Sequence, residues 1–245
     1  MAGHSHWSKI KRAKGANDAK RGKIWSKIAR KIIISARSGG GDPRDNLNLR
    51  YIIDEARAVN MPKDTIEKAI AKGTGELGGE QFEAVMYEGY GPGGVAFIVE
   101  GLTNNRTRTA PEMRRIFEMA GGNLATSGAV SFQFIKQGII TIKADAIAED
   151  QLIEQALEAG AEDVKNEGEV FEVITTPAAF LKVKEALTNL KIPIEASEVT
   201  NLPNTTVPVQ GDVAQRILKL IDTFEDHEDV QNVSHNAEIP ESIAV

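Results

Sequence analysis

The stretch AVMYEGYGPGGVAFIVEGL, residues 84–102, divides the chain into two differently patterned parts. Its two apolar runs flank a Pro/Gly turn, which is typical of a β-hairpin. Gly89, Gly91 and Gly94 also satisfy the G-x-G-x-x-G spacing of dinucleotide-binding loops. That fingerprint requires a helix after the last glycine, because the helix N-terminus holds the pyrophosphate. A strand-like run follows instead, so we predict a hairpin turn and no dinucleotide site.

A helix is predicted directly after the hairpin, at residues 110–120. Thr109 and Glu112 have the T-x-x-E spacing of a capping box, in which each side chain accepts a hydrogen bond from an unpaired backbone amide. Residues 121–128, GGNLATSG, are predicted to form a loop because glycine and small polar residues dominate them.

Residues 131–200 show the order β, α, β, β, α, β, which is typical of the split βαβ, ferredoxin-like fold. The predicted strands are 139–143, 161–165, 170–176 and 194–200, and the predicted helices are 149–159 and 177–190. A helix at 212–224 and a strand at 229–235 follow. Together with the hairpin and helix before residue 131, they complete another small α/β sheet. We therefore expect the ferredoxin-like unit to be inserted into a discontinuous domain.

Upstream of the hairpin, apolar residues recur at the three- and four-residue spacings of helices. Helices are predicted at 18–37, 46–59 and 63–72, with Gly/Pro stops between them. The expected fold class is therefore α+β, with an N-terminal three-helix domain followed by two small α/β domains, one ferredoxin-like and inserted in the other. The predicted domains are residues 1–78, residues 79–130 plus 204–238, and residues 131–203.

The N-terminal segment is strongly basic, although the whole chain has a net charge of -6. Residues 1–37 hold eleven Lys or Arg and one acid, whereas residues 73–245 hold 28 acids and twelve bases. Such asymmetry favours a polyanion partner at one end only. The predicted nucleic-acid-binding residues are Lys9, Lys11, Arg12, Lys14, Lys20, Arg21, Lys23, Lys27, Arg30, Lys31 and Arg37.

The alternative for this segment is an ordinary solvated helix face. On the first helix, Lys23, Lys27 and Lys31 lie opposite the apolar positions Ile28 and Ile32, so we expect these lysines to face solvent. One acid cannot neutralise so many bases through i,i+4 pairs, which favours phosphate binding.

A possible second patch follows the hairpin. Arg106, Arg108, Arg114 and Arg115 lie within ten positions and flank a predicted helix N-terminus, which is itself an anion-binding feature. Salt bridges to the surrounding acidic residues are an equally open interpretation of these arginines.

Several function classes lack support in the sequence. The chain contains no cysteine, and it has neither a G-x-S-x-G nor a G-x-x-x-x-G-K-[ST] motif. Apolar runs stay well below the roughly 18 residues of a membrane span. We therefore expect a cytoplasmic, non-enzymatic monomer without cofactor or membrane partner. An enzyme remains an alternative, with a site formed only in three dimensions around residues 104–109 and 121–128.

Both ends of the chain contain potential metal ligands. After removal of Met1, Ala2-Gly3-His4 has the nitrogen ligands that Cu(II) or Ni(II) prefers, but a flexible polar tail is the simpler interpretation. His227 lies in EDHEDV, residues 225–230, where a solvated loop is expected rather than a ligand set. No metal site is predicted.

Eight exact segments give the chain its resemblance to the YebC family, to which the mitochondrial translational activator of cytochrome oxidase belongs. These segments are MAGHS (1–5), DAKRGK (18–23), GGGDP (39–43), YEGYGPGG (87–94), NNRTRT (104–109), GGNL (121–124), EAGAEDV (158–164) and DVQNV (229–233). The resemblance implies a helical N-terminal domain, two α/β domains and a non-enzymatic regulator of gene expression.

Two kinds of regulator are compatible with this resemblance. Some members resemble DNA-binding transcriptional regulators, and others resemble ribosome-associated factors that bind ribosomal RNA or tRNA and help proline-rich sequences through translation. The sequence does not choose between DNA and RNA, because phosphate contacts dominate affinity for both and carry no sequence information. Trp7 is a candidate for stacking on an exposed base.

Overall fold

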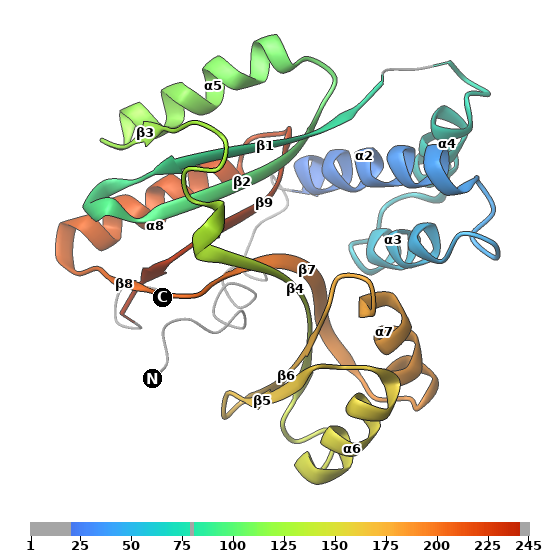
Figure 1. The fold of residues 1–245 in the computed structure, drawn as a ribbon. Helices are drawn as coiled ribbons and strands as arrows, with labels where there is room; N and C mark the ends of the chain where they lie inside the picture. The colour runs from blue at the N-terminus through green and yellow to red at the C-terminus, as the bar shows by residue number, and fades with distance from the viewer. Residues whose placement is uncertain (1–20, 79–80, 241–245) are drawn as a thin grey trace. The chain divides into compact units, whose positions relative to one another are not determined.

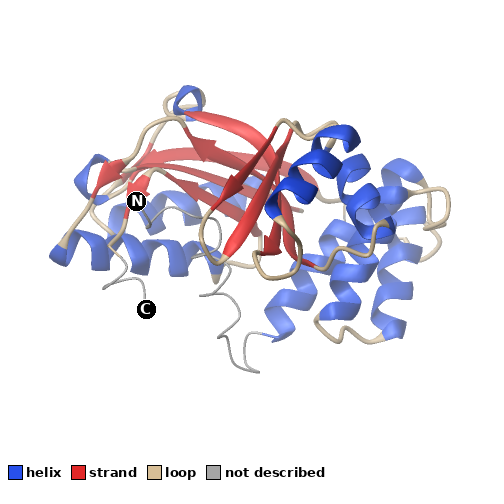
Figure 2. Ribbon diagram, turned by 90° about the horizontal axis from the view of Figure 1, so that it is seen from below, coloured by secondary structure: helices blue, strands red, loops and turns tan. Residues whose placement is uncertain are grey.

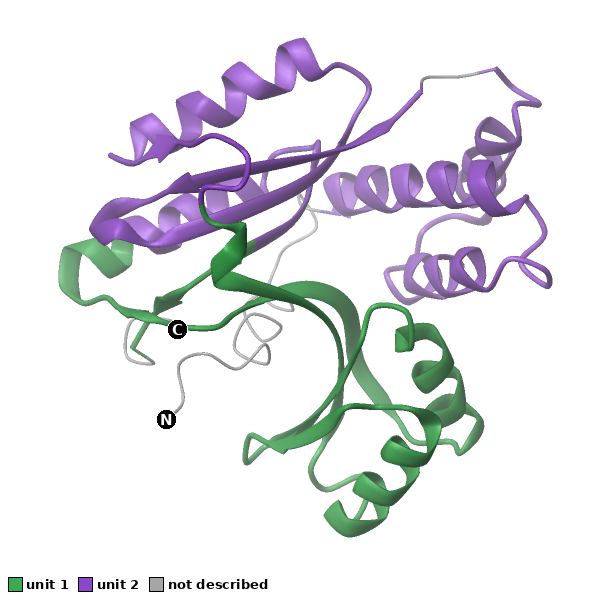
Figure 3. Cartoon of the chain, viewed as in Figure 1, with its two compact units in different colours: residues 1–15, 130–215, 234–245 green, residues 16–129, 216–233 purple. Residues whose placement is uncertain are grey.

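The structure is a computed structural model that describes residues 21–78 and 81–240. The chain divides into two compact units (Figure 3). One comprises residues 16–129 and 216–233, and the other comprises residues 1–15, 130–215 and 234–245. The three domain boundaries predicted from the sequence stay a prediction.

The first unit begins with the three predicted helices, now defined as α2 (Arg21–Gly39), α3 (Leu47–Ala58) and α4 (Lys63–Thr74). Their apolar faces meet in one core, in which Ile32 and Leu49 are fully buried. No strand lies among these helices within the described residues (Figure 1 and Figure 2). The predicted helical N-terminal segment is confirmed.

Asn46 organises the connection between α2 and α3. Its side-chain oxygen accepts a hydrogen bond from the Leu49 amide at 3.0 Å, which caps α3, and its amide group donates to the Ser35 and Gly40 carbonyls, both at 2.9 Å. Asparagine is among the preferred N-cap residues because its short side chain reaches the first-turn amides. The buried side chain therefore satisfies the start of one helix and the end of another.

The hairpin predicted from residues 84–102 is confirmed. Strand β1 (Glu83–Tyr90) pairs antiparallel with β2 (Ala96–Thr103), and Tyr90 lies opposite Ala96. A short 3-10 turn at Pro92–Gly94 joins them, with Gly93 at φ 73°. Glycine adopts this left-handed conformation without a steric penalty.

This hairpin belongs to a four-stranded sheet of order β3-β1-β2-β9. Strand β3 (Asn123–Leu124) pairs with β1, and β9 (Val230–His235) lies beside β2 although the chain reaches it only after the ferredoxin-like segment. The middle sheet is therefore discontinuous in sequence, as predicted. Helices α5 (Arg106–Met119) and α8 (Gly211–Glu225) cover this sheet.

Three phenylalanines form the contact between this sheet and its helices. Phe97 of β2, Phe117 of α5 and Phe224 of α8 are fully buried. The Phe117 and Phe224 rings meet edge-to-face with centroids 4.8 Å apart, and the Phe97 ring lies 6.1 Å from that of Phe117. Because all three rings touch, α5 and α8 pack on the same face of the sheet.

The capping box predicted for α5 is wrong. The helix begins at Arg106, and its cap is Asn105, whose side chain accepts from the Arg108 amide at 3.1 Å. Thr109 lies inside the helix and is buried. Its hydroxyl donates a hydrogen bond to the Asp229 carboxylate, with 2.7 Å between the two oxygen atoms. The helix thus begins four residues earlier than predicted, and Thr109 donates a tertiary hydrogen bond instead of capping the helix.

The second unit contains the ferredoxin-like arrangement, whose strands pair antiparallel in the order β5-β6-β4-β7. Its elements are β4 (Phe134–Lys143), α6 (Glu149–Ala159), β5 (Asp163–Asn166), β6 (Val170–Thr175), α7 (Phe180–Asn189) and β7 (Ile194–Pro203). Both helices pack on one face over Ile140, Ile142 and Val173. A turn at Ser131–Gln133 precedes β4, and the short strands β8 (Val207–Pro208) and β10 (Ala237–Glu238) pair in parallel.

The predicted fold class is therefore confirmed: the chain is α+β, and its N-terminal helices are followed by two four-stranded sheets, one of which is inserted in the sequence of the other. Within the described ranges, none of the helices has the length and apolar character needed to cross a bilayer.

Candidate nucleic-acid interface

The predicted basic residues divide into two groups in the structure. Lys9, Lys11, Arg12, Lys14 and Lys20 lie outside the described residues, as do Trp7 and the Ala2-Gly3-His4 terminus. The other six, on α2, are Arg21, Lys23, Lys27, Arg30, Lys31 and Arg37. The described part of the predicted interface is thus a single amphipathic helix whose apolar face is buried in the helical core.

Three of these cations form one stripe along α2 and contact the protein's own acidic residues. We call Lys23, Lys27 and Arg30 the basic stripe, and residues 225–229, EDHED, the acidic turn. The acidic turn joins α8 to β9 and lies in the same compact unit as α2.

The contacts follow the helix in order. Lys23 Nζ lies 3.6 Å from the Asp226 carboxylate, and Lys27 Nζ donates to the Glu225 carbonyl at 2.5 Å. Arg30 lies 3.3 Å from the Glu228 carboxylate and 2.9 Å from that of Asp229, and it also donates to the Glu228 carbonyl.

The expectation that the basic side of α2 faces solvent is therefore wrong for Lys27. Only 11% of the Arg30 side chain is exposed, which shows the same packing one turn further on. Periodicity identified the side of the helix that faces away from the helical core. It did not reveal that the α8–β9 connection packs against that side.

The central residue of the basic stripe, Lys27, is largely desolvated. Burial lowers the pKa of the Lys27 ammonium from 10.5 to about 8, although the neighbouring Glu225 and Asp226 charges oppose the shift. A buried ammonium gives up hydration that a single carbonyl acceptor replaces only in part. Lys27 is thus a cation whose charge its present surroundings do not fully compensate.

The remaining described cations of α2 point elsewhere. Lys31 forms a half-exposed salt bridge with Glu55 of α3 at 3.0 Å, and Arg37 donates to the Phe82 carbonyl at 2.8 Å. Arg21 is exposed in the first turn of α2.

The basic stripe ends at the Asp229 carboxylate, which is fully buried. Its Oδ2 atom accepts from Thr109 at 2.7 Å, Arg108 at 2.7 Å and Thr103 at 3.2 Å. Its Oδ1 atom lies 2.9 Å from the Arg30 guanidinium and forms an ion pair with it. Oδ1 accepts no hydrogen bond from the described residues.

The surroundings keep Asp229 ionised. Burial by itself raises the pKa of its carboxyl, but the hydrogen bonds from Thr109 and Arg108 and the charge of Arg30 outweigh burial, so this pKa lies below its usual value of 3.8. A buried carboxylate needs such charge-assisted partners, because an unpaired one is costly. Asp229 therefore links the basic stripe of α2 to the second predicted patch.

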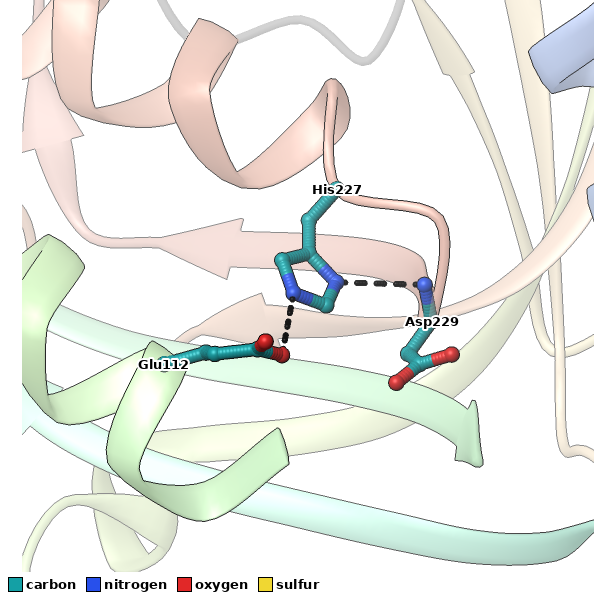
Figure 4. Close-up of side chains that lie close together, drawn as sticks. All are labelled: Glu112, His227 and Asp229. Atoms are coloured by element: carbon teal, nitrogen blue, oxygen red, sulfur yellow. Dashed lines mark hydrogen bonds and ion pairs between the residues drawn. The ribbon is translucent and has the colours of Figure 1, made fainter. Parts of the chain in front are cut away.

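Glu112, His227 and Asp229 form the one trio of potential metal ligands found among the described residues, with ligand atoms within 4.8 Å of one another (Figure 4). The His227 Nδ1 atom accepts from the Asp229 backbone amide at 3.1 Å, so Nε2 carries the proton and donates to Glu112 at 3.1 Å. His227 is partly buried by these contacts, and the expectation of a solvated loop at this residue is wrong.

The donor set of this trio is poorly suited to a cation. Both imidazole nitrogens are used in hydrogen bonds, and the Asp229 oxygens already face the guanidinium groups of Arg30 and Arg108. The two guanidinium charges, at 2.9 and 2.7 Å from the Asp229 oxygens, would repel a metal ion bound to this carboxylate. We interpret the trio as a hydrogen-bonded support for the acidic turn.

The second predicted patch is split by the fold. Arg108 donates inward to Asp229, as the salt-bridge interpretation anticipated, and the exposed Arg106 lies 3.7 Å from Glu83. Arg114 and Arg115 lie on the exposed face of α5, and neither side chain forms a hydrogen bond or ion pair with another described residue. These two arginines are the members of the patch available to a partner.

The loops considered for an enzyme site are occupied by structural hydrogen bonds. Thr109 is bound to Asp229, and the Gly128 amide donates to the buried Glu88 carboxylate at 2.8 Å. These contacts hold the two loops in place. The alternative of an enzyme gains no support from them.

Sequence reasoning missed the role of Asp229. Thr109 and Asp229 both lie in segments that the sequence analysis quoted, but no motif indicated that they contact each other. The charge complementarity between residues 20–31 and the acidic turn was visible in the sequence, but about 200 positions separate the two segments. Predicting this contact requires knowing that β9, which follows the acidic turn, pairs with β2.

An N-terminal helical bundle with a cationic helix, followed by a discontinuous sheet carrying an inserted ferredoxin-like unit, defines the class of this protein. Two family profiles match the chain: the TACO1/YebC protein N-terminal domain over residues 5–76, and the TACO1/YebC second and third domain over residues 82–237. The chain belongs to the TACO1/YebC family.

Relatives match over nearly the whole chain. A probable transcriptional regulatory protein of Geobacter sulfurreducens is 51% identical over 98% of this chain and 96% of its own length. A protein with the same description from Desulfatibacillum aliphaticivorans is 52% identical, with 98% of each chain covered. The crystal structure of a conserved hypothetical protein from Aquifex aeolicus superposes with a TM-score of 0.82 at 48% identity, covering 91% of this chain and 93% of that one.

Proposed function

We propose that this protein is a non-enzymatic, nucleic-acid-binding regulator of gene expression that acts in the cytoplasm. The observation that carries the proposal is the charge distribution: eleven bases and one acid in residues 1–37 of a chain whose net charge is -6. The relatives' description as probable transcriptional regulatory proteins supports the same role.

The physical argument concerns what can stabilise such a segment. Crowded like charges repel one another, and a nucleic-acid backbone relieves this repulsion while releasing its own counterions. The acidic remainder of the chain repels the same backbone, so contact is restricted to the N-terminal helix and the exposed arginines of α5. We propose duplex DNA as the target, because the relatives are described as probable transcriptional regulatory proteins. Ribosomal RNA or tRNA is the alternative, because it offers the same phosphates.

Affinity measured at several salt concentrations tests the proposal. The full chain is titrated with a 20-base-pair DNA duplex, with a ribosomal RNA fragment and with tRNA. We expect log affinity to fall linearly with log salt for at least one of them, because displaced counterions accompany each phosphate contact. Affinity that is absent, or independent of salt, for all three probes would overturn the proposal.

A second experiment identifies the target in cells. Crosslinked nucleic acid is recovered with the protein, and DNA, ribosomal RNA and tRNA are scored together. Enrichment at defined promoters indicates a transcriptional regulator, whereas co-sedimentation with ribosomes that survives DNase indicates a translation factor.

A further inference from the structure

The basic stripe has the geometry of a backbone-tracking surface but is occupied by the protein itself. Lys23, Lys27 and Arg30 follow one another at four- and three-residue spacings, so their side chains lie along one face of α2. All three contact the acidic turn, through the carboxylates of Asp226, Glu228 and Asp229 and the carbonyls of Glu225 and Glu228. A row of acceptors at such spacing resembles a run of phosphates in its charge and in its hydrogen-bonding capacity.

The contact is strong at one end of the stripe and weak at the other. Arg30 faces the fully buried Asp229, which Arg108 and Thr109 also hold. At the opposite end, the Lys23 and Asp226 side chains are each 50% exposed. An exposed pair of this kind contributes little to stability and is screened by salt. Only the Asp229 end therefore requires a large free energy to break.

At Lys27, in the middle of the stripe, a phosphate oxygen would be a better hydrogen-bond acceptor than the present one. The Lys27 ammonium is desolvated, yet the acceptor within hydrogen-bonding distance is the neutral Glu225 carbonyl. The lowered pKa of Lys27 reflects this loss of hydration. A phosphate oxygen would offer the same hydrogen bond with a full negative charge, and charge-assisted hydrogen bonds are the stronger ones.

We propose that Lys23, Lys27 and Arg30 form a phosphate-backbone site that the acidic turn occupies in the absence of nucleic acid. Incoming phosphates displace the Asp226 and Glu228 carboxylates from the stripe, while Asp229 keeps its hold on Arg108 and anchors the turn. The inference rests on the proposed function and adds to it an internal competitor. Binding is thereby weakened for short or sparse polyanions.

A double variant removes the competitor and leaves the anchor. Asp226→Asn with Glu228→Gln neutralises the two exposed carboxylates and preserves Asp229 and the backbone carbonyls. The matched control is Glu154→Gln with Glu158→Gln, two exposed acids of α6 in the other unit, which changes the net charge equally. Each protein is titrated with the 20-base-pair duplex and with a single-stranded RNA of equal length.

We expect the turn variant to bind at least one probe about 3- to 10-fold more tightly than the control variant at low salt, because two carboxylates that compete with phosphate for the stripe are removed. Equal affinity of the two variants would overturn the inference while leaving the proposed function intact. Salt-insensitive or absent binding by all proteins, wild type included, would instead overturn the proposed function.

Zero-length crosslinking of the wild-type chain gives an independent readout. A carbodiimide activates the Asp226 carboxylate and joins it to the Lys23 amine as an amide, with loss of the activating group as a urea. We expect the yield of this crosslink to fall several-fold when the duplex or RNA is added. The Lys63–Glu67 pair of α4, at 3.5 Å, is the internal control. A Lys23–Asp226 yield that stays constant at saturating nucleic acid would contradict displacement of the turn.

Discussion

The Arg30 guanidinium lies 2.9 Å from the buried Asp229 carboxylate, and this pair joins the cationic helix α2 to the start of strand β9. The same carboxylate accepts a hydrogen bond from Arg108 of α5 at 2.7 Å. One acid thus neutralises a residue from each of the two basic patches that the sequence predicts. Asp229 therefore holds α2, α5 and the start of β9 together, and Arg30 and Arg108 are less available to a nucleic-acid partner than the exposed cations.

Replacing Asp229 by Asn should destabilise the protein by about 3–5 kcal/mol, because two guanidinium groups lose a buried counter-charge. The pKa of Asp229 is lowered in the folded state, so its contribution is present above pH 3.8 and is lost as the pH falls through the folded value. Urea unfolding at pH 7 and at pH 3 measures both effects. The stability difference between wild type and variant should shrink at the lower pH.

The control for this prediction is Asp226→Asn in the same turn. Its pair with Lys23 is half-exposed, so the expected loss is below about 1 kcal/mol. Equal losses for the two variants would show that burial of Asp229 does not govern the stability of the turn.

Replacing Lys27 by Met should stabilise the protein at pH 7 by about 1–3 kcal/mol, because burial lowers the pKa of Lys27 from 10.5 to about 8. Between these two values the unfolded chain binds the proton that the folded chain has lost, so wild-type stability rises with pH across this window. The advantage of the variant should therefore diminish from pH 8 to pH 10.5. Urea midpoints at four pH values measure it.

Lys27→Arg provides the matching comparison, because arginine keeps its charge throughout this range. The arginine variant should lack the rise in stability that Lys27 gives the wild type above pH 8. A wild-type pH profile superimposable on that of the arginine variant would contradict the lowered pKa.

Replacing Gly73 by Ala should destabilise the helical bundle by about 1–3 kcal/mol. A Cβ atom at this position of α4 would lie 2.6 Å from the Ile33 carbonyl oxygen and 2.7 Å from the Ala36 Cβ atom, so α2 and α4 would have to separate. A Cβ atom added at Gly22 of α2 would meet no atom within 4 Å, and Gly22→Ala should instead stabilise by up to about 1 kcal/mol through helix propensity. Thermal unfolding of the two variants should shift in opposite directions.

Replacing Arg114 and Arg115 by Gln should lower the slope of log affinity against log salt by about 1.8 for duplex DNA if both arginines contact phosphates, at about 0.9 for each. Stability should change by less than about 0.5 kcal/mol, because both side chains are exposed. Lys165→Gln with Lys182→Gln, two exposed lysines of the ferredoxin-like unit, is the charge-matched control. Parallel salt lines for wild type and the arginine variant would remove α5 from the interface.

Most of the secondary structure and the order of the sheets can be predicted from local patterns in the chain. Helix α6 begins and ends where its pattern predicts, and the Pro/Gly turn at residues 91–94 specifies the hairpin. Periodicity, capping residues and turn residues act within a few positions, so they can be recognised in a single sequence. The insertion follows as well, because strands left without partners before and after residues 131–203 have to complete one another.

The surroundings of the charged side chains depend instead on the folded arrangement. Thr109 matches a capping box in sequence, yet Asn105 caps the helix and the Thr109 hydroxyl donates to Asp229. Lys27 matches a solvent-exposed position, yet the acidic turn covers it. The physical reason is that charge interactions depend on distance in space and on burial, and the partners in these two contacts lie 120 and 198 positions apart in the sequence. A local pattern determines which side of a helix is polar, whereas the fold determines what that side meets.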